Sequence, residues 1–154
     1  MRIRPPGAMR RLLPLLAVVT LVAACGFGGS SSKQLSHEAL VKKADEICTA
    51  AHAEVTKSKP PTKPGDVLPA LDAALANGER ELGQLRALKP SAADAKAYAG
   101  LLTRLQRTIQ LTRRARDAVK AKQTLRAQVL IQVAVRSNTE AQAYAGGFGL
   151  QVCS

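Results

Sequence analysis

The stretch SAADAKAYAGLLTRLQRTIQLTRRARDAVK, residues 91–120, decides the fold of this 154-residue chain. Ser91 is a preferred helix-capping residue type, and Asp94 follows it by three residues, as in a capping box. Beyond them a stripe recurs at spacings of three and four residues, which is the period of one helix face: Tyr98, Leu102, Leu105, Ile109, Thr112, Ala115 and Val119. We therefore predict a long amphipathic helix here.

Two further helices are predicted before this stretch. The first begins at the capping residue Ser36 and ends at Lys57, with the stripe Leu40, Ala44, Ile47, Ala51 and Val55. Three prolines between Ser58 and Gly65 then exclude helix. The second helix opens at Asp66 and ends at Lys89, with the stripe Leu71, Leu75, Leu82, Leu85 and Leu88.

The segment 124–146 has two interpretations. Val129, Ile131, Val133 and Val135 alternate as in a half-buried strand. A helical stripe also fits: Leu125, Val129, Val133, Ser137, Ala141, Tyr144 and Phe148. We favour the helix, because the chain offers no second strand and a lone strand leaves its backbone groups unpaired. We expect Gly146, Gly147 and Gly149 to end this helix.

The four segments predict an all-α fold, an antiparallel four-helix bundle over residues 36–154. The composition agrees, because 46% of the residues are hydrophobic and Ala, Leu, Arg and Lys favour helix. The length suits one domain. These properties exclude a wholly disordered chain and a large β-sandwich.

Residues 1–24 have the layout of an export signal, a basic region followed by the apolar run Leu12–Ala24, too short to be a permanent membrane span. The run ends Val22-Ala23-Ala24-Cys25, which resembles the lipobox of bacterial lipoproteins. This resemblance implies cleavage before Cys25 and a diacylglyceryl (palmitate-type) lipid on Cys25, whose two acyl chains suffice for stable membrane anchoring. The Gly- and Ser-rich residues 25–35 then form a tether. The alternative is a plain secretory signal that leaves Cys25 as a free thiol.

Export leaves Cys48 and Cys153 in an oxidising environment, so we predict a disulfide between them. The rival interpretation is a metal site that uses Cys48, His52 and His37, but three or four convergent ligands are needed. We expect no metal and no cofactor. The layout also resembles small helical lipoproteins of high-GC bacteria, through Ala44-Asp45-Glu46-Ile47-Cys48 and the segment from Gly147 to Cys153. That resemblance implies the same fold and disulfide and no particular activity.

A basic stripe stands out between Arg104 and Arg126, where eight basic residues accompany a single acid, Asp117. The candidate anion-binding residues are Arg104, Arg107 and Arg114 on one face, and Arg113, Arg116 and Lys120 on an adjacent one. Asp117 is placed to pair with Arg113. The stripe predicts contact with lipid head groups, an anionic envelope polymer or an acidic protein, or else it is simply a solvated face. Nucleic acid is a poor partner for an exported chain with few aromatic residues.

The sequence lacks the convergent groups and motifs that catalysis requires, so we do not expect an enzyme. A hydrolase would need an acid–base pair such as His52 with a carboxylate. We predict instead a lipid-anchored binding or scaffolding protein on the outer face of the cell membrane. The alternative is a small-molecule carrier or sensor with a pocket between helices, near Gly78, Gly83 and Tyr98.

Overall fold

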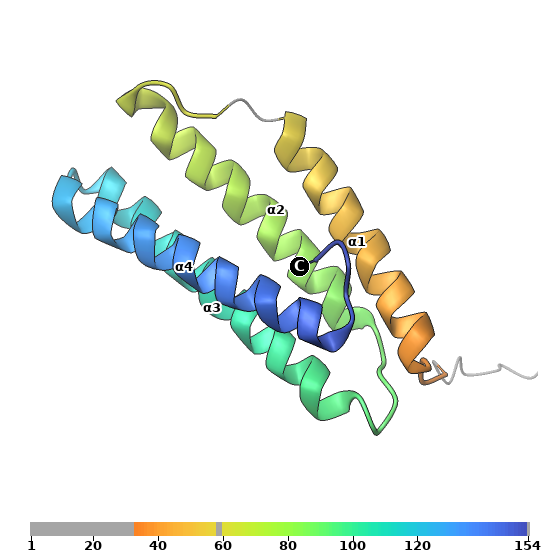
Figure 1. Ribbon diagram of the computed structural model, residues 1–154. Coiled ribbons are helices and arrows are strands. Elements are labelled where there is room, and N and C mark those ends of the chain that lie inside the picture. Colours follow the sequence, from red (N-terminus) through yellow and green to blue (C-terminus); the bar gives the residue numbers. More distant parts are fainter. Residues whose placement is uncertain (1–32, 58–59, 154) are drawn as a thin grey trace, which may run out of the picture. The chain divides into compact units, whose positions relative to one another are not determined.

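A computed structural model describes residues 33–57 and 60–153, which belong to one compact unit. The predicted leader, the lipidation residue Cys25 and the tether as far as Ser32 lie outside the described residues. The fold is all-α, as predicted, with α1 (His37–Lys57), α2 (Val67–Ala87), α3 (Ala95–Lys120) and α4 (Thr124–Phe148) (Figure 1). A short 3₁₀ helix, η1 (Pro64–Asp66), precedes α2. None of the described helices meets the length and hydropathy needed to cross a bilayer.

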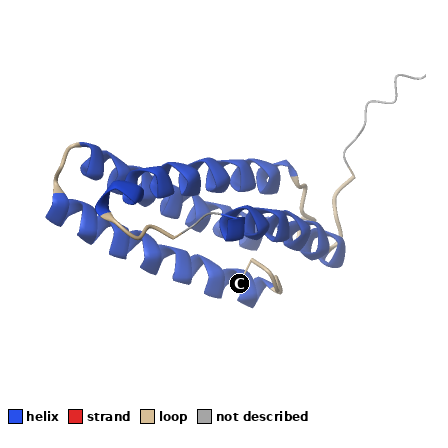
Figure 2. Cartoon of the chain, turned by 90° about the horizontal axis from the view of Figure 1, so that it is seen from above, coloured by secondary structure: helices blue, strands red, loops and turns tan. Residues whose placement is uncertain are grey.

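The helices pack antiparallel in chain order, α1 on α2, α2 on α3, and α3 on α4 (Figures 1 and 2). The first helix is the outlier, because no Cα atom of α1 lies within 8 Å of a Cα atom in α3 or α4. Helices in direct ridge-and-groove contact have axes about 8–10 Å apart. The bundle is therefore tight between α3 and α4 and open between α1 and α4.

The core lies where the beginnings of α1 and α3 meet the ends of α2 and α4. Its members are Leu40, Ala44, Leu85, Tyr98, Leu101, Ala145 and Leu150, all at most 1% exposed. Tyr98 is the largest of them, and its hydroxyl donates to the carbonyl oxygen of Leu85 at 2.9 Å. That bond satisfies the one polar group that the ring brings into the core.

Residues 129–135 are helical, which settles the choice between strand and helix. The predicted stripe of α4 is wrong in its first half, however, because Leu125, Val129 and Val133 are exposed. The residues buried against the rest of the bundle are small: Ala127, Ala134, Ser137, Ala141 and Ala145. Small side chains let α4 approach α3 closely, and Ser137 lies 2.9 Å from Thr108 of α3, oxygen to oxygen.

The glycines at the end of α4 act differently from our prediction. The helix runs through Gly146 and Gly147 and ends after Phe148. Gly149 has φ 103°, and the N–H of Leu150 donates to Ala145 O at 3.0 Å. A left-handed residue of this kind, usually glycine, reverses the chain after a helix. Only Gly149 is thus required as a helix stop, and the segment after it turns back toward α1 (Figure 1).

Of the three predicted caps, Ser36 is confirmed, because its Oγ accepts from the N–H of Ala39 at 3.3 Å. Ser91 Oγ accepts from the N–H of Asp94 at 3.3 Å, but this bond closes the turn before α3, whose N-cap position is Asp94. Asp66 does precede α2, but its carboxylate faces backward and accepts from Thr62 and Lys63. Asp66 therefore fixes the proline-rich connection and does not cap the helix that follows.

Two helix-interior glycines provide a matched test of the packing. A Cβ on Gly100 would lie 2.6 Å from Tyr144 Oη, whereas one on Gly83 would meet nothing within 4 Å. We expect Gly100→Ala to lower the free energy of unfolding by about 1–3 kcal/mol, as overpacking does. Gly83→Ala should raise it by about 0.5–1 kcal/mol through helix propensity. Urea unfolding of both variants measures this, and equal effects would contradict the described α3–α4 contact.

Candidate functional site

The predicted disulfide is confirmed and joins the chain terminus to the first helix. The Cα atoms of Cys48 and Cys153 are 5.3 Å apart, within the usual range for a disulfide. Asp45, one turn before Cys48, accepts from the N–H of Gln151 at 3.1 Å and from that of Val152 at 2.9 Å. We call the disulfide and Asp45 together the tail clamp. The clamp holds α1 to the C-terminal segment of the chain.

Beyond the clamp, the space between α1 and α4 forms a groove. Two cavities, of about 400 and 290 Å³, share the lining residues Val55, Asn77, Glu81, Leu105 and Asn138. Because the two cavities share these walls, we describe them as one inter-helix groove that all four helices line. The volume of the larger cavity lies within the range of small-molecule sites.

The two ends of the groove differ in chemistry. The larger cavity is walled mainly by apolar side chains of α2, α3 and α4: Leu71, Ala74, Leu75, Leu82, Ile109, Ala134 and Val135. The smaller cavity lies at the disulfide, with Cys153 in its wall, and adds His52 and Gln142 to the shared Glu81 and Asn138. The end of the groove at the disulfide therefore has the larger share of polar side chains.

Glu81 is the group with the most unusual surroundings. Its Oε1 lies 3.4 Å from Cys48 Sγ, but a disulfide sulfur carries no proton to donate. In the described part of the chain, no N–H or O–H donates to this carboxyl group. Burial raises the pKa of Glu81 above its ordinary value of 4.5, because a charged carboxylate loses water there. Such a group gains most from a ligand that supplies donors or positive charge.

The residues predicted for a carrier pocket separate in the structure. Gly78 lines the groove, where a Cβ would lie 3.4 Å from Ile109 Cγ1. Gly83 is exposed, and Tyr98 belongs to the filled core at the other end of α2. The cavity is therefore displaced along α2 from the predicted place, toward Leu71 and away from Tyr98.

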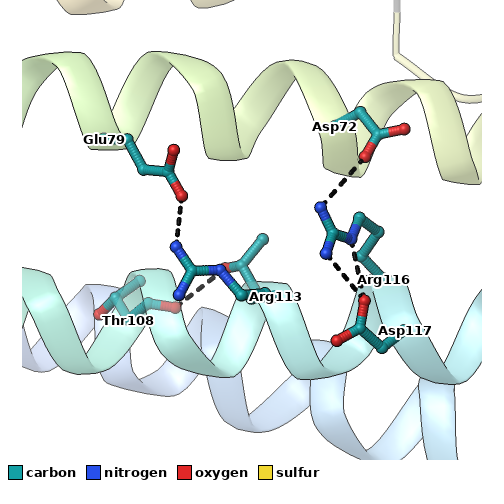
Figure 3. A network of polar contacts seen from close by, with 7 residues as sticks. Asp72, Glu79, Thr108, Arg113, Arg116 and Asp117 are labelled. Atoms are coloured by element: carbon teal, nitrogen blue, oxygen red, sulfur yellow. Dashed lines mark hydrogen bonds and ion pairs between the residues drawn. The ribbon is translucent and has the colours of Figure 1, made fainter.

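Two of the six predicted anion-binding residues form ion pairs within the protein. Arg113 pairs with Glu79 of α2, and Arg116 contacts Asp72 of α2 at 3.7 Å (Figure 3). The expected pairing of Asp117 with Arg113 is wrong, because Asp117 pairs with its neighbour Arg116 at 2.9 Å. The two arginines point toward α2, where the carboxylates lie, and so they connect α2 with α3.

The other four basic residues differ among themselves. The Arg104 guanidinium stacks over the Tyr144 ring, 3.9 Å from its centroid, in a cation–π contact between α3 and α4. Within the described residues, Arg107, Arg114 and Lys120 have no hydrogen bond or ion pair, and all three are exposed. Only these three remain available to an external anion without breaking an existing contact.

The histidines do not form the metal site considered above. His37 Nδ1 lies 2.9 Å from Asp94 Oδ1, and the His37 ring packs on Phe148 at 5.1 Å between centroids. Hydrogen bonds from Ser91 and then from His37 lower the pKa of Asp94. His52 faces the groove instead. Across residues 33–57 and 60–153, no three His, Cys, Asp or Glu side chains gather as metal ligands.

Sequence reasoning missed Asp45 and Glu81. Glu81 lies four residues before Leu85 and three after Gly78, so an acid occupies the apolar face of α2. That spacing was a usable signal. No comparable sequence signal marks Asp45, because its partners are backbone N–H groups more than 100 residues away along the chain.

Comparison of this chain with protein-family models, with curated proteins and with solved structures finds no match.

The raised pKa of Glu81 makes a prediction for stability. Well below pH 4.5 the carboxyl is protonated in both folded and unfolded chains. As pH rises the unfolded chain ionises first, so stability is lost as pH rises through the folded pKa. Glu81→Gln removes this loss, so the variant should gain stability relative to wild type as pH rises above 4.5. Urea unfolding across pH measures it, and parallel pH profiles would contradict the burial of this charge.

Proposed function

We propose that this protein is a lipid-anchored binding protein on the outer face of the cell membrane, and that it holds a small, largely apolar molecule in the inter-helix groove. The lipobox-like sequence that ends at Cys25 supports the anchor. The Cys48–Cys153 disulfide agrees with an exported domain, since such bonds persist in oxidising compartments. No catalytic step is part of the proposal.

The groove itself is the observation that carries this function. It is lined mostly by apolar side chains, with a few polar groups gathered at one end, which is the usual composition of a ligand site. It exists because α1 stands away from α3 and α4 while the tail clamp keeps it attached. A closed bundle would have buried these walls against one another.

Two valines of α4 give a matched pair of variants. Val135 lines the groove and is 62% exposed, whereas Val129 is 59% exposed and lies outside it. We expect Val135→Arg to weaken binding of the neutral probe 4-phenylbutanol about tenfold, since an apolar wall is lost. Val129→Arg should leave it unchanged. The readout is the shift of the Val55 methyl resonances of the purified full chain in lipid nanodiscs. Equal affinity in both variants would contradict binding in the groove.

The exposed residues Arg107, Arg114 and Lys120 favour a second candidate, contact with an anionic envelope polymer or an acidic protein. They have no partner within the described residues, and Arg107 and Arg114 are seven residues apart, so both lie on one face of α3. Exposed charges of one sign raise association rates and give salt-sensitive binding.

Charge reversal tests this second candidate. We expect Arg107→Glu with Arg114→Glu to weaken binding of soluble poly-L-glutamate at low salt by about tenfold or more, because attraction becomes repulsion. Lys42→Glu with Lys43→Glu, on the exposed face of α1, makes the same change in net charge and is the control. Titration calorimetry at several salt concentrations provides the measurement. Equal losses in both variants would reduce the effect to net charge and overturn a specific basic face.

A further inference from the structure

We propose that the ligand of the groove is a small organic cation, an amine or ammonium head on an apolar body, held by Glu81 at the disulfide end. This inference rests on the proposed function, since it names the class of molecule that the same groove accepts. It adds a direction of binding and a selecting residue.

The direction follows from the distribution of side chains along the groove. Beyond the shared walls, the larger cavity offers mainly Leu, Ile, Ala and Val side chains, whereas the smaller one adds the polar groups of His52 and Gln142. An apolar body is best removed from water in the larger cavity. A polar head then lies among Glu81, Asn138 and Gln142, whose oxygens all accept hydrogen bonds.

The sign of the head group follows from charge. The chain outside residues 1–24 has 19 Lys and Arg against 11 Asp and Glu. Nevertheless, among residues 33–57 and 60–153, no Lys or Arg side chain lines either cavity of the groove, and Glu81 is the only carboxylate that does. A groove whose described walls carry one carboxylate and no Lys or Arg side chain is complementary to a cation.

Glu81 also has capacity to accept. Its Oε1 lies 3.4 Å from the disulfide sulfur, which has no proton, and no donor among the described residues forms a hydrogen bond with the carboxylate. An ammonium group brings both charge and N–H donors, and charge-assisted hydrogen bonds are about twice as strong as neutral ones. A neutral ligand can donate only an uncharged hydrogen bond, which is weaker, and an anionic one adds repulsion.

Three probes with one apolar body separate these cases: 4-phenylbutylamine, 4-phenylbutanol and 4-phenylbutanoate. They are titrated into the full chain in lipid nanodiscs, and the Val55 and Val135 methyl shifts report occupancy of the groove. We expect the amine to bind about tenfold more tightly than the alcohol, and the carboxylate to bind most weakly. Glu81→Gln should bring the amine to the affinity of the alcohol and leave the alcohol within about twofold.

Glu79→Gln is the matched control, because it removes an equal charge two residues away, from a carboxylate that faces Arg113 outside the groove. It should keep the preference for the amine. Equal loss in the two variants would overturn the role of Glu81. A different result would separate the two proposals. If the alcohol binds, Val135→Arg weakens its binding, and the amine binds no more tightly than the alcohol, then the proposed cationic ligand is wrong but binding in the groove is supported. If no probe binds, the proposed function fails together with this inference.

Discussion

The tail clamp is the constraint on which the rest of this structure depends. The disulfide joins residues 105 apart in sequence, and Asp45 adds hydrogen bonds to the backbone beside it. Closing a loop of this length contributes about 4–5 kcal/mol in the chain-entropy model, a large share of a small domain's stability. The backbone of α1 comes close only to that of α2, and side chains of α1 meet α3 and α4 only at the core end, so the clamp adds a covalent tie between α1 and the C-terminal segment. The stability that the clamp adds allows the domain to stay folded although the groove between its helices is not filled.

Charge is distributed so that the interior and the groove are separated from the basic surface. Arg113 and Arg116 face carboxylates of α2, and Arg104 covers Tyr144, so these three stabilise helix pairs. Such exposed pairs each contribute about 0–1 kcal/mol, and their main effect is on the register of α2 against α3. Arg107, Arg114 and Lys120 remain at the surface. Among the described residues that line the groove, Glu81 is the one carboxylic acid. This strongly basic chain therefore has an outer surface that carries positive charge and a groove that carries a carboxylic acid.

Local rules predicted the helices of this fold, because their information lies within a turn or two of each residue. The stripes of α1 and α2, the cap at Ser36 and the pair of cysteines were readable in this way. The exposure of Leu125 and Val129 could not be predicted in this way, because the buried face of α4 is determined by its contact with α3. The site was harder still. The spacing of Glu81 from Leu85 placed an acid on an apolar face, but that face is an open groove only because α1 stands away from α4.

The most direct test of this account is hydrogen exchange on a chain whose clamp is removed by Cys48→Ser, Cys153→Ser and Asp45→Asn. If the clamp holds α1, the amides of α1 should lose protection first and most, while those of α3 and α4 exchange nearly as in the wild type. Unchanged protection of α1 would show that its contacts with α2 suffice and that the groove does not depend on the C-terminal segment. An equal loss in all four helices would likewise contradict a local role for the clamp.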